Sequence, residues 1–433
     1  MIRQIISTTA TRFLVAGISF LIVVANSRNI GAAGVGTIGI IILDITIITI
    51  ISGFFGGPSF VYFTPRKRIK DLLSVSFMSV IPGPAVFLSV YYLLDRFSDY
   101  ATVFAPQSYL IHIVLLAVLL VLHSNNMAII LGRQRIYAHN LITLLQQVTT
   151  VITLLVLFFV RNDYSVMAYL KAYYAGLIIS MVPALVLAIG EMKNDDKTGK
   201  LSMSFLKEIL AYGFTVQLAS LFQIFNYRMP YYFLKSFFPA GNRLGVFTVS
   251  TQLAEGLWII GKSISMVQYS RISNVNDRKI NSDLTVNLLK FSVIITFILL
   301  IILLVLPVNF YIYVFGFSDF GQVKTVILYL SPGIIALTAN MILSHFLSGI
   351  GKPVYNLIVS FTGLVTIAVT GYCLVESMGL SGAAIAASVT YLVTALLSFY
   401  YYFKQSDSTL SDLIIRVDDF VFFKKIIKEI IGK

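Results

Sequence analysis

The sequence predicts an all-α, polytopic membrane protein of about twelve transmembrane helices arranged as two parallel six-helix repeats. Of its 433 residues, 58% are hydrophobic and only 12% are charged, and the mean hydropathy is +0.87. That composition leaves too little polar surface to cover a soluble protein of this size. The chain also nearly repeats itself, because GRQRIYAHNLI at 132–142 is echoed by GIGKPVYNLI at 349–358.

Two sets of six apolar runs lie on either side of the polar segment EMKNDDKTGK at 191–200. Each run reaches the ~20 residues that cross a hydrocarbon core ~30 Å thick. The first six are expected at 5–27, 37–63, 72–94, 107–131, 137–160 and 166–190. The second six are expected at 207–234, 244–270, 285–315, 322–348, 354–376 and 380–403.

These runs divide the chain into a lobe at 1–195, a second lobe at 196–405 and a tail at 406–433. Six spans per lobe is an even number, so both lobes begin on the same side and the repeats are parallel. The tail from Ser411 onward places apolar residues and lysines at helical spacing. We expect it to form an amphipathic helix on the anionic inner leaflet.

Lys and Arg are distributed unequally between the two sides of the predicted bundle. With the N-terminus in the cytoplasm, the inner segments hold about three times as many cations as the outer loops. The sequence therefore predicts a multi-pass membrane protein with both termini cytoplasmic. The same bias explains the net charge of +13, so no nucleic-acid partner is expected.

No enzyme or metal motif accompanies the spans. Cys373 is the only cysteine, which excludes an internal disulfide framework and a cysteine metal cluster. The chain has no Walker phosphate loop, no HExxH pair and no GxSxG elbow. We therefore expect neither enzymatic activity nor a resident cofactor or metal.

Five ionisable residues fall inside predicted spans: Arg12, Asp44, Arg228, Glu255 and Lys262. Each would cost about 2.5–3.5 kcal/mol facing lipid at the bilayer centre, so each should face protein or water. They lie on the first two helices of each repeat, and cations outnumber carboxylates. This weighting suits an anionic cargo such as a diphosphate. The alternative is that Asp44 pairs with Arg228 and Glu255 with Lys262, solely to hold helices together.

Other polar side chains occur within the spans at neutral positions, and interhelical hydrogen bonding is the favoured interpretation for them. They are His112, His123, Asn125, Asn126, Gln146, Gln147, Asn340 and His345.

Three segments suggest a family. YGFTVQLASLFQIFNYRMPYYFLKSFFPAGNRLGVFTVSTQLAEGLWIIGKSISMVQYSRIS at 212–273 resembles the seventh and eighth helices of bacterial polysaccharide flippases of the Wzx type. LSPGIIALTANMILSHFLSGIGKPVYNLIVSFTGL at 330–364 and GLSGAAIAASVTYLV at 379–393 resemble their tenth to twelfth helices. These flippases belong to the multidrug/oligosaccharidyl-lipid/polysaccharide exporter (MOP) superfamily, whose MATE members share the two-lobed architecture.

The resemblance implies a flippase for undecaprenyl-diphosphate-linked oligosaccharide repeat units of O-antigen, lipopolysaccharide, capsule or exopolysaccharide, working by alternating access. Arg12, Arg228 and Lys262 are the positions that fit the family's substrate-binding cavity cations. Asp44 and Glu255 are candidates for coupling to a proton or sodium gradient. The implied partners are the lipid-linked oligosaccharide, membrane lipid and other polysaccharide assembly proteins. Lipid II flippases are expected to carry extra C-terminal helices, which disfavours a peptidoglycan precursor.

Two other functions remain open. A drug antiporter of the same superfamily would use Asp44 and Glu255 to couple a cationic cargo to an ion gradient, but cations outnumber carboxylates here. A polytopic polysaccharide polymerase would need a sizeable outer loop, and no predicted outer loop exceeds about fifteen residues.

Overall fold

The computed structural model describes residues 2–57, 59–97, 103–193, 202–272, 277–414 and 419. Over these ranges the chain is helical, with short turns and no strand, which confirms the all-α prediction. It forms two compact units, which are described separately. Unit 1 contains Met1–Val249 and Asn309–Val323, and unit 2 contains Ser250–Val308 and Lys324–Lys433. The division into repeats at residue 195 stays a prediction, and most of the predicted tail helix lies outside the described residues.

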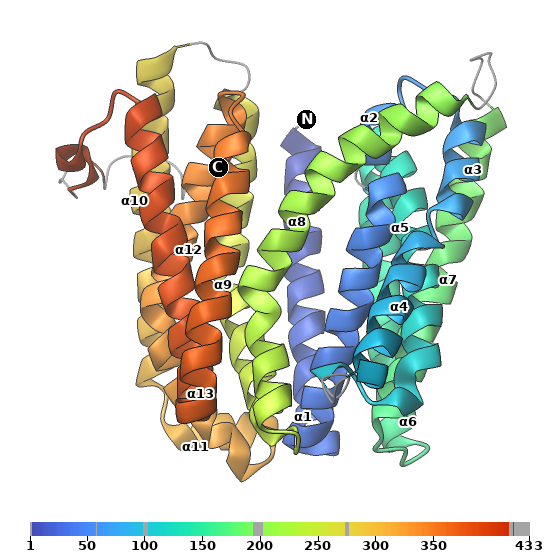
Figure 1. Ribbon diagram of the computed structural model, residues 1–433, viewed down its shortest axis with the longest axis vertical. Helices are drawn as coiled ribbons and strands as arrows, with labels where there is room; N and C mark the ends of the chain where they lie inside the picture. The colour runs from blue at the N-terminus through green and yellow to red at the C-terminus, as the bar shows by residue number, and fades with distance from the viewer. Residues whose placement is uncertain are drawn as a thin grey trace. The chain divides into compact units, whose positions relative to one another are not determined.

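Unit 1 is a bundle in which α6 lies along α7 and α1 packs on both α5 and α6 (Figure 1). The start of α9 and the short α11 also belong to it. Its helices are α1 (Ile2–Ser52), α2 (Ser59–Phe63), α3 (Ile69–Met78), α4 (Pro82–Phe97), α5 (Leu110–Gly132), α6 (Ile136–Phe159), α7 (Val166–Lys193), α8 (Met203–Phe237), the first residues of α9 (Asn242–Ile272) and α11 (Val308–Phe315). The 3-10 turns are η1 (Gly53–Phe55), η3 (Gln107–Tyr109) and η4 (Ser318–Gln322).

Glycine and proline set the breaks in unit 1. α1 contains the first two predicted spans, separated at Gly31, whose φ of 71° lies in the left-handed region. The predicted run 37–63 is interrupted, because α1 ends at Ser52 and Gly57 has a φ of 58° before α2 begins. The predicted run 72–94 is split into α3 and α4, and Pro82 opens α4, where its missing N–H costs nothing.

Small residues allow α9 to begin directly against α1. A side chain at Gly245 would overlap the carbonyl of Ala32, and one at Gly36 would overlap the carbonyl of Gly241. Gly39 lies equally close to Thr248. This glycine seam brings the two backbones into contact, which larger residues would prevent.

Unit 2 contains the rest of α9 together with α10 (Arg278–Val305), α12 (Val323–Gly349), α13 (Val354–Gln405) and η5 (Leu410–Leu413). α13 holds the last two predicted spans, which meet at Gly379 with a φ of 57°. The predicted run 285–315 is two helices, because the chain leaves α10 at Leu306 and Pro307 before α11. Phe346 and Tyr402 anchor an apolar cluster between α10, α12 and α13.

The two echoed segments form the same turn. Between α5 and α6, Arg135 donates its N–H to Ile130 O at 3.1 Å, and Gln134 has a φ of 59°. Between α12 and α13, Lys352 donates its N–H to Leu347 O at 2.9 Å, and Gly351 has a φ of 77°. Both are helix ends closed by a residue in the left-handed region. The echo therefore marks equivalent turns.

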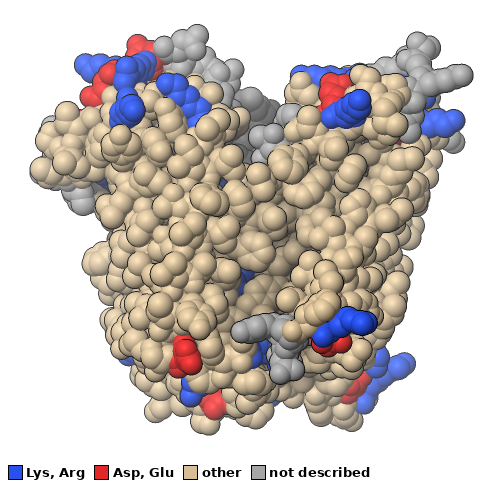
Figure 2. All heavy atoms as spheres, viewed as in Figure 1, with Lys and Arg blue, Asp and Glu red and all other residues tan. Residues whose placement is uncertain are grey.

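Eight helical stretches are long and apolar enough to cross a membrane. Two of them, Thr11–Phe63 and Val354–Gln405, contain the breaks at Gly31 and Gly379, and α8 and α9 bring the bundle to about twelve helices. On the face shown in Figure 2, charged side chains gather near the helix ends and a broad band between them is almost free of charge. The protein is a multi-pass membrane protein.

Candidate functional site

Asp44 is fully buried in the second segment of α1. Its Oδ1 accepts a hydrogen bond from the Tyr232 hydroxyl at 2.9 Å, and its Oδ2 accepts one from the Ala105 N–H at 3.0 Å. The carboxylate thus joins three parts of unit 1: α1, α8 and the segment before η3. Each of its oxygens has a protein donor, as a buried carboxylate requires.

Aromatic rings enclose this carboxylate. Phe104 packs edge-on against Tyr232, with ring centroids 5.7 Å apart, and against Phe87 at 5.3 Å. Both packings place an apolar surface beside the Tyr232 hydroxyl that bonds Asp44. These rings keep water away from Asp44 and Tyr232. A change in the charge of Asp44 must therefore be compensated by its hydrogen-bond partners.

Arg228 lies one turn before Tyr232 on α8 and is half-buried. Its Nη1 donates to the Tyr231 hydroxyl at 2.7 Å, and its guanidinium carbon lies 5.1 Å from the centre of that ring. Asp44 bonds Tyr232 and Ala105 and forms no ion pair with Arg228 among the described residues. The alternative that the span charges form internal ion pairs stays a prediction, with Tyr232 and Ala105 as the partners found for Asp44.

Arg12 is half-buried in the first segment of α1 and acts electrostatically on His139 of α6. His139 also contacts His123 of α5 electrostatically and hydrogen-bonds the Asn140 side chain. The sequence interpretation did not single out His139, because it lies next to the loop cations rather than mid-span. Arg12 is the cation of this group.

In unit 2, Glu255 is half-buried and Lys262 is exposed on α9. Lys262 acts electrostatically on His345 of α12 and forms no ion pair with Glu255 in the described part of the chain. His345 is held by a 2.8 Å contact between its Nδ1 and Met341 O. Glu255 and Lys262 lie two turns apart on one helix, and the alternative that they pair stays a prediction.

The neutral polar residues mostly join helices. Asn125 accepts from the Gly57 N–H at 2.6 Å and donates to Ser76 and Ser79, so one amide fixes α5 to α3 and to the turn after η1. In unit 2, Ser398 donates to Asn340 at 2.6 Å. For these two asparagines the structure supports the interhelical interpretation.

Unit 1 also has a contact network around Gly31. The Arg28 guanidinium donates to the Tyr313 carbonyl at 2.7 Å, and the Phe317 ring covers Gly31. Asn242 donates to Asp319 at 3.0 Å. Together with the glycine seam, these contacts hold α11, η4 and the start of α9 on α1.

Among the described residues, no group of three or more His, Cys, Asp or Glu side chains has the arrangement to hold a metal ion. The five predicted charges split between the units as Arg12, Asp44 and Arg228 in unit 1 and Glu255 and Lys262 in unit 2. Two features escaped the sequence interpretation: Tyr232 as the partner of Asp44, and Lys290, which was assigned to an inner loop but is buried within α10.

No protein-family model matches the sequence, and no curated protein matches it. The fold does match solved structures. A lipid II flippase, MurJ, in an inward closed conformation is similar with a TM-score of 0.70 and 15% identity over 98% of each chain. Because that flippase is covered almost completely, the extra C-terminal helices expected of it are not found in this comparison.

Two further solved structures are transporters. An inward-facing multidrug resistance MATE family transporter of the MOP superfamily matches with a TM-score of 0.66 and 17% identity, over 92% of this chain and 94% of that one. A MOP superfamily transporter from Pyrococcus furiosus, described as having a binding pocket of reverse polarity, matches with a TM-score of 0.61 and 16% identity, over 93% of this chain and 94% of that one. This chain therefore has the membrane-transporter fold shared by MurJ and the MATE proteins of the MOP superfamily.

Proposed function

We propose that the protein is a flippase that moves undecaprenyl-diphosphate-linked oligosaccharide units across the bacterial inner membrane by alternating access, with both termini cytoplasmic. The observation that carries the proposal is the state of the charges. Asp44 accepts hydrogen bonds from the Tyr232 hydroxyl and the Ala105 N–H, and Lys262 has no carboxylate partner in the described residues. Asp44 therefore bonds neutral donors, and the helices that carry Arg12, Arg228 and Lys262 hold more cations than carboxylates.

A diphosphate headgroup is an anion of the kind that the cations Arg12, Arg228 and Lys262 can bind. Fixed cations replace its hydration as it passes through an apolar environment, and guanidinium groups bind phosphate oxygens in a fork geometry. The polyprenyl chain is as apolar as lipid and needs no protein site. Sugar units would meet tyrosines such as Tyr227 beside Arg228. The cations and tyrosines of these helices would thus bind the headgroup and the sugars, while the polyprenyl chain stays in lipid.

Alternating access requires contacts that can part and re-form. The glycine seam and the Arg28–Tyr313 contact are of this kind, since they rest on backbone contact and one charge-assisted hydrogen bond rather than on interlocked large side chains. We take them as the closed gate on the outer side.

Asp44 is the proposed coupling carboxylate. In its ionised form both oxygens accept, from Tyr232 and Ala105. A proton on either oxygen makes that oxygen a weaker acceptor and adds an O–H that needs an acceptor of its own, so the bond from Tyr232 or from Ala105 is weakened. Proton binding would thereby loosen α8 or the segment before η3. Glu255 is the equivalent candidate in unit 2.

The test is a vesicle flipping assay with fluorescent undecaprenyl-diphosphate oligosaccharide and the variants Arg12→Gln, Arg228→Gln and Lys262→Gln. Each should lower the rate at least about tenfold, because a charge-assisted hydrogen bond contributes about 1.5–3 kcal/mol. Lys279→Gln, an exposed cation at the start of α10, is the matched control and should flip at the wild-type rate. Wild-type rates in all three cavity variants would reject the proposal. Lipid II offered in the same assay separates a peptidoglycan precursor from an oligosaccharide repeat unit.

A drug antiporter is the second candidate, favoured by the buried carboxylate Asp44 and the similarity to the MATE transporter fold. Such a protein would export a lipophilic cation, and its rate would fall with Asp44→Asn but rise or stay unchanged with Arg228→Gln. Measuring both cargoes with both variants distinguishes the two functions. Collapsing the proton and sodium gradients in turn identifies the coupling ion, and indifference to both would reject coupling.

A further inference from the structure

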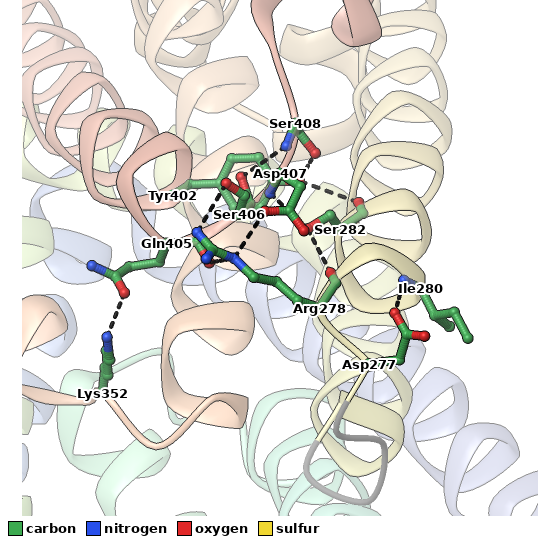
Figure 3. Close-up of polar contacts among 10 residues, drawn as sticks. All are labelled: Asp277, Arg278, Ile280, Ser282, Lys352, Tyr402, Gln405, Ser406, Asp407 and Ser408. Carbon is green, nitrogen blue, oxygen red and sulfur yellow. Dashed lines mark hydrogen bonds and ion pairs between the residues drawn. The ribbon is translucent and has the colours of Figure 1, made fainter.

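Beyond the end of α13, the chain turns back onto α10. Arg278 at the start of α10 donates to Gln405 O at 3.1 Å and Ser406 O at 3.3 Å, and it pairs with Asp407 at 3.1 Å (Figure 3). One turn further along α10, the Ser282 hydroxyl accepts from the Asp407 N–H at 3.3 Å. The segment after Gln405 is thus bonded to α10 through its own backbone.

Tyr402 extends these contacts into the core of unit 2. Its fully buried hydroxyl donates to Ser282 O at 3.2 Å and lies 2.8 Å from the Ser408 hydroxyl, as Figure 3 shows. The Tyr402 ring packs on Phe346 of α12, and Leu413 of η5 packs on the same apolar cluster. The returning segment is therefore seated on α10, α12 and α13 together.

The last described contact lies much further along α10. Lys290 Nζ and Asp419 Oδ2 are 2.9 Å apart, and both residues are buried, with 6% and 8% exposed. Lys290 follows Arg278 by twelve residues, which is about 18 Å of helix. A ~30 Å hydrocarbon core takes about 20 residues, so counting back from Val305 the core extends past Lys290.

We propose that the chain after α13, described over residues 405–414 and at Asp419, is a strap that lies along α10 as far as the level of the membrane core and is held there by the Lys290–Asp419 ion pair. The strap ties the cytoplasmic ends of α10 and α13 to one another and supplies the counter-charge for a lysine that would otherwise be stranded in lipid. Of its two ion pairs, Arg278–Asp407 is half exposed and weak, whereas Lys290–Asp419 is shielded from water and holds the strap.

The proposal is tested by the reactivity of a single cysteine in the strap. In a Cys373→Ser background, Leu413→Cys reports docking because Leu413 is packed on the core cluster, and Ser411→Cys is an exposed reference. Labelling with a membrane-impermeant maleimide in inside-out vesicles should be slow at position 413 and fast at position 411. This readout is independent of transport, so it stands whether or not the flippase proposal does.

Lys290→Met or Asp419→Met should accelerate labelling at position 413 at least about tenfold, because each leaves one buried charge without a partner. The double variant Lys290→Met with Asp419→Met should return to the slow rate. Asp419→Asn is the conservative variant if the others fail to accumulate, and it should give an intermediate rate. Lys279→Gln is the control and should change nothing. Slow labelling in the single variants, or fast labelling in the wild-type background, would overturn the strap.

Discussion

The two echoed turns differ in what they hold. In unit 1, Arg133 and Arg135 both reach Glu191 near the end of α7, and Glu191 is only 7% exposed. In unit 2, Lys352 reaches the amide oxygen of Gln405 at the end of α13. The same backbone turn thus binds a later helix of its own unit, α7 or α13, through an ionic contact in one case and an ion–dipole contact in the other.

The difference shows whether the backbone or the side chains of the repeated turn are constrained. The backbone hydrogen bonds and the left-handed residue recur, because they close a helix end whatever the side chains are. The side-chain contact does not recur. In unit 2 the strap makes up for the weaker contact, since Arg278, rather than a residue of the turn, secures the end of α13.

The largest effect is expected from removing the shared carboxylate in unit 1. Glu191→Leu removes the buried carboxylate that Arg133 and Arg135 share, and it should lower the free energy of unfolding by about 2–3 kcal/mol. Thermal unfolding in detergent measures it. Gln405→Leu is the matched change in unit 2 and should cost less than half as much. Equal losses would show that the two contacts are equivalent after all.

A smaller effect is expected from exchanging the left-handed residues. Gly351→Ala should cost about 1 kcal/mol, since no neighbour lies within 4 Å of the added methyl group and only the positive φ is penalised. Gln134→Gly should stabilise unit 1 by a similar amount. The two variants are compared by their unfolding midpoints, and a stabilising Gly351→Ala would contradict the equivalence of the turns.

Converting the neutral contact into an ionic one should have a modest effect. Gln405→Glu gives Lys352 a carboxylate, but Lys352 is exposed, so a gain of about 0–1 kcal/mol is expected and should shrink in high salt. The converse variant Glu191→Gln removes the ionic contact of unit 1. If the unfolding free energies of the two variants depend equally on salt, burial does not distinguish the contact at Glu191 from the contact at Gln405.

The smallest effect is expected in the loop between α6 and α7. Asp163 accepts from Ser165 at 2.6 Å and Lys171 at 3.0 Å, and these contacts lower its pKa. Because the folded pKa lies below the unfolded one, the stabilisation is present at neutral pH and is lost as the pH falls through the folded pKa. Asp163→Asn should flatten this part of the pH–stability profile slightly. An unchanged profile would mean that the exposed contacts contribute nothing.

The fold was predictable because hydropathy and length decide where helices cross a membrane. The breaks between helices were harder to predict. Gly57 before α2 and Pro307 before α11 are present in the sequence, but each lies in a continuous run of apolar residues that reads as a single span. Partners of single side chains were not predictable. Asp44 has a nearby arginine in the pattern, yet it bonds Tyr232, because helix rotation and depth decide which groups meet. Lys290 pairs with a residue 129 positions away, and no periodicity reports that.

The continuous backbone through Gly31 has a consequence for how the protein is made. α1 crosses from its first to its second span without a loop, so little more than Arg28 and a few small residues has to pass through the bilayer during insertion. The break at Gly31 leaves only the few backbone groups of two helix ends to be desolvated, which limits the cost of crossing. The first two spans can therefore enter the membrane as one hairpin, and a longer or more polar insert at Gly31 would separate insertion into two steps.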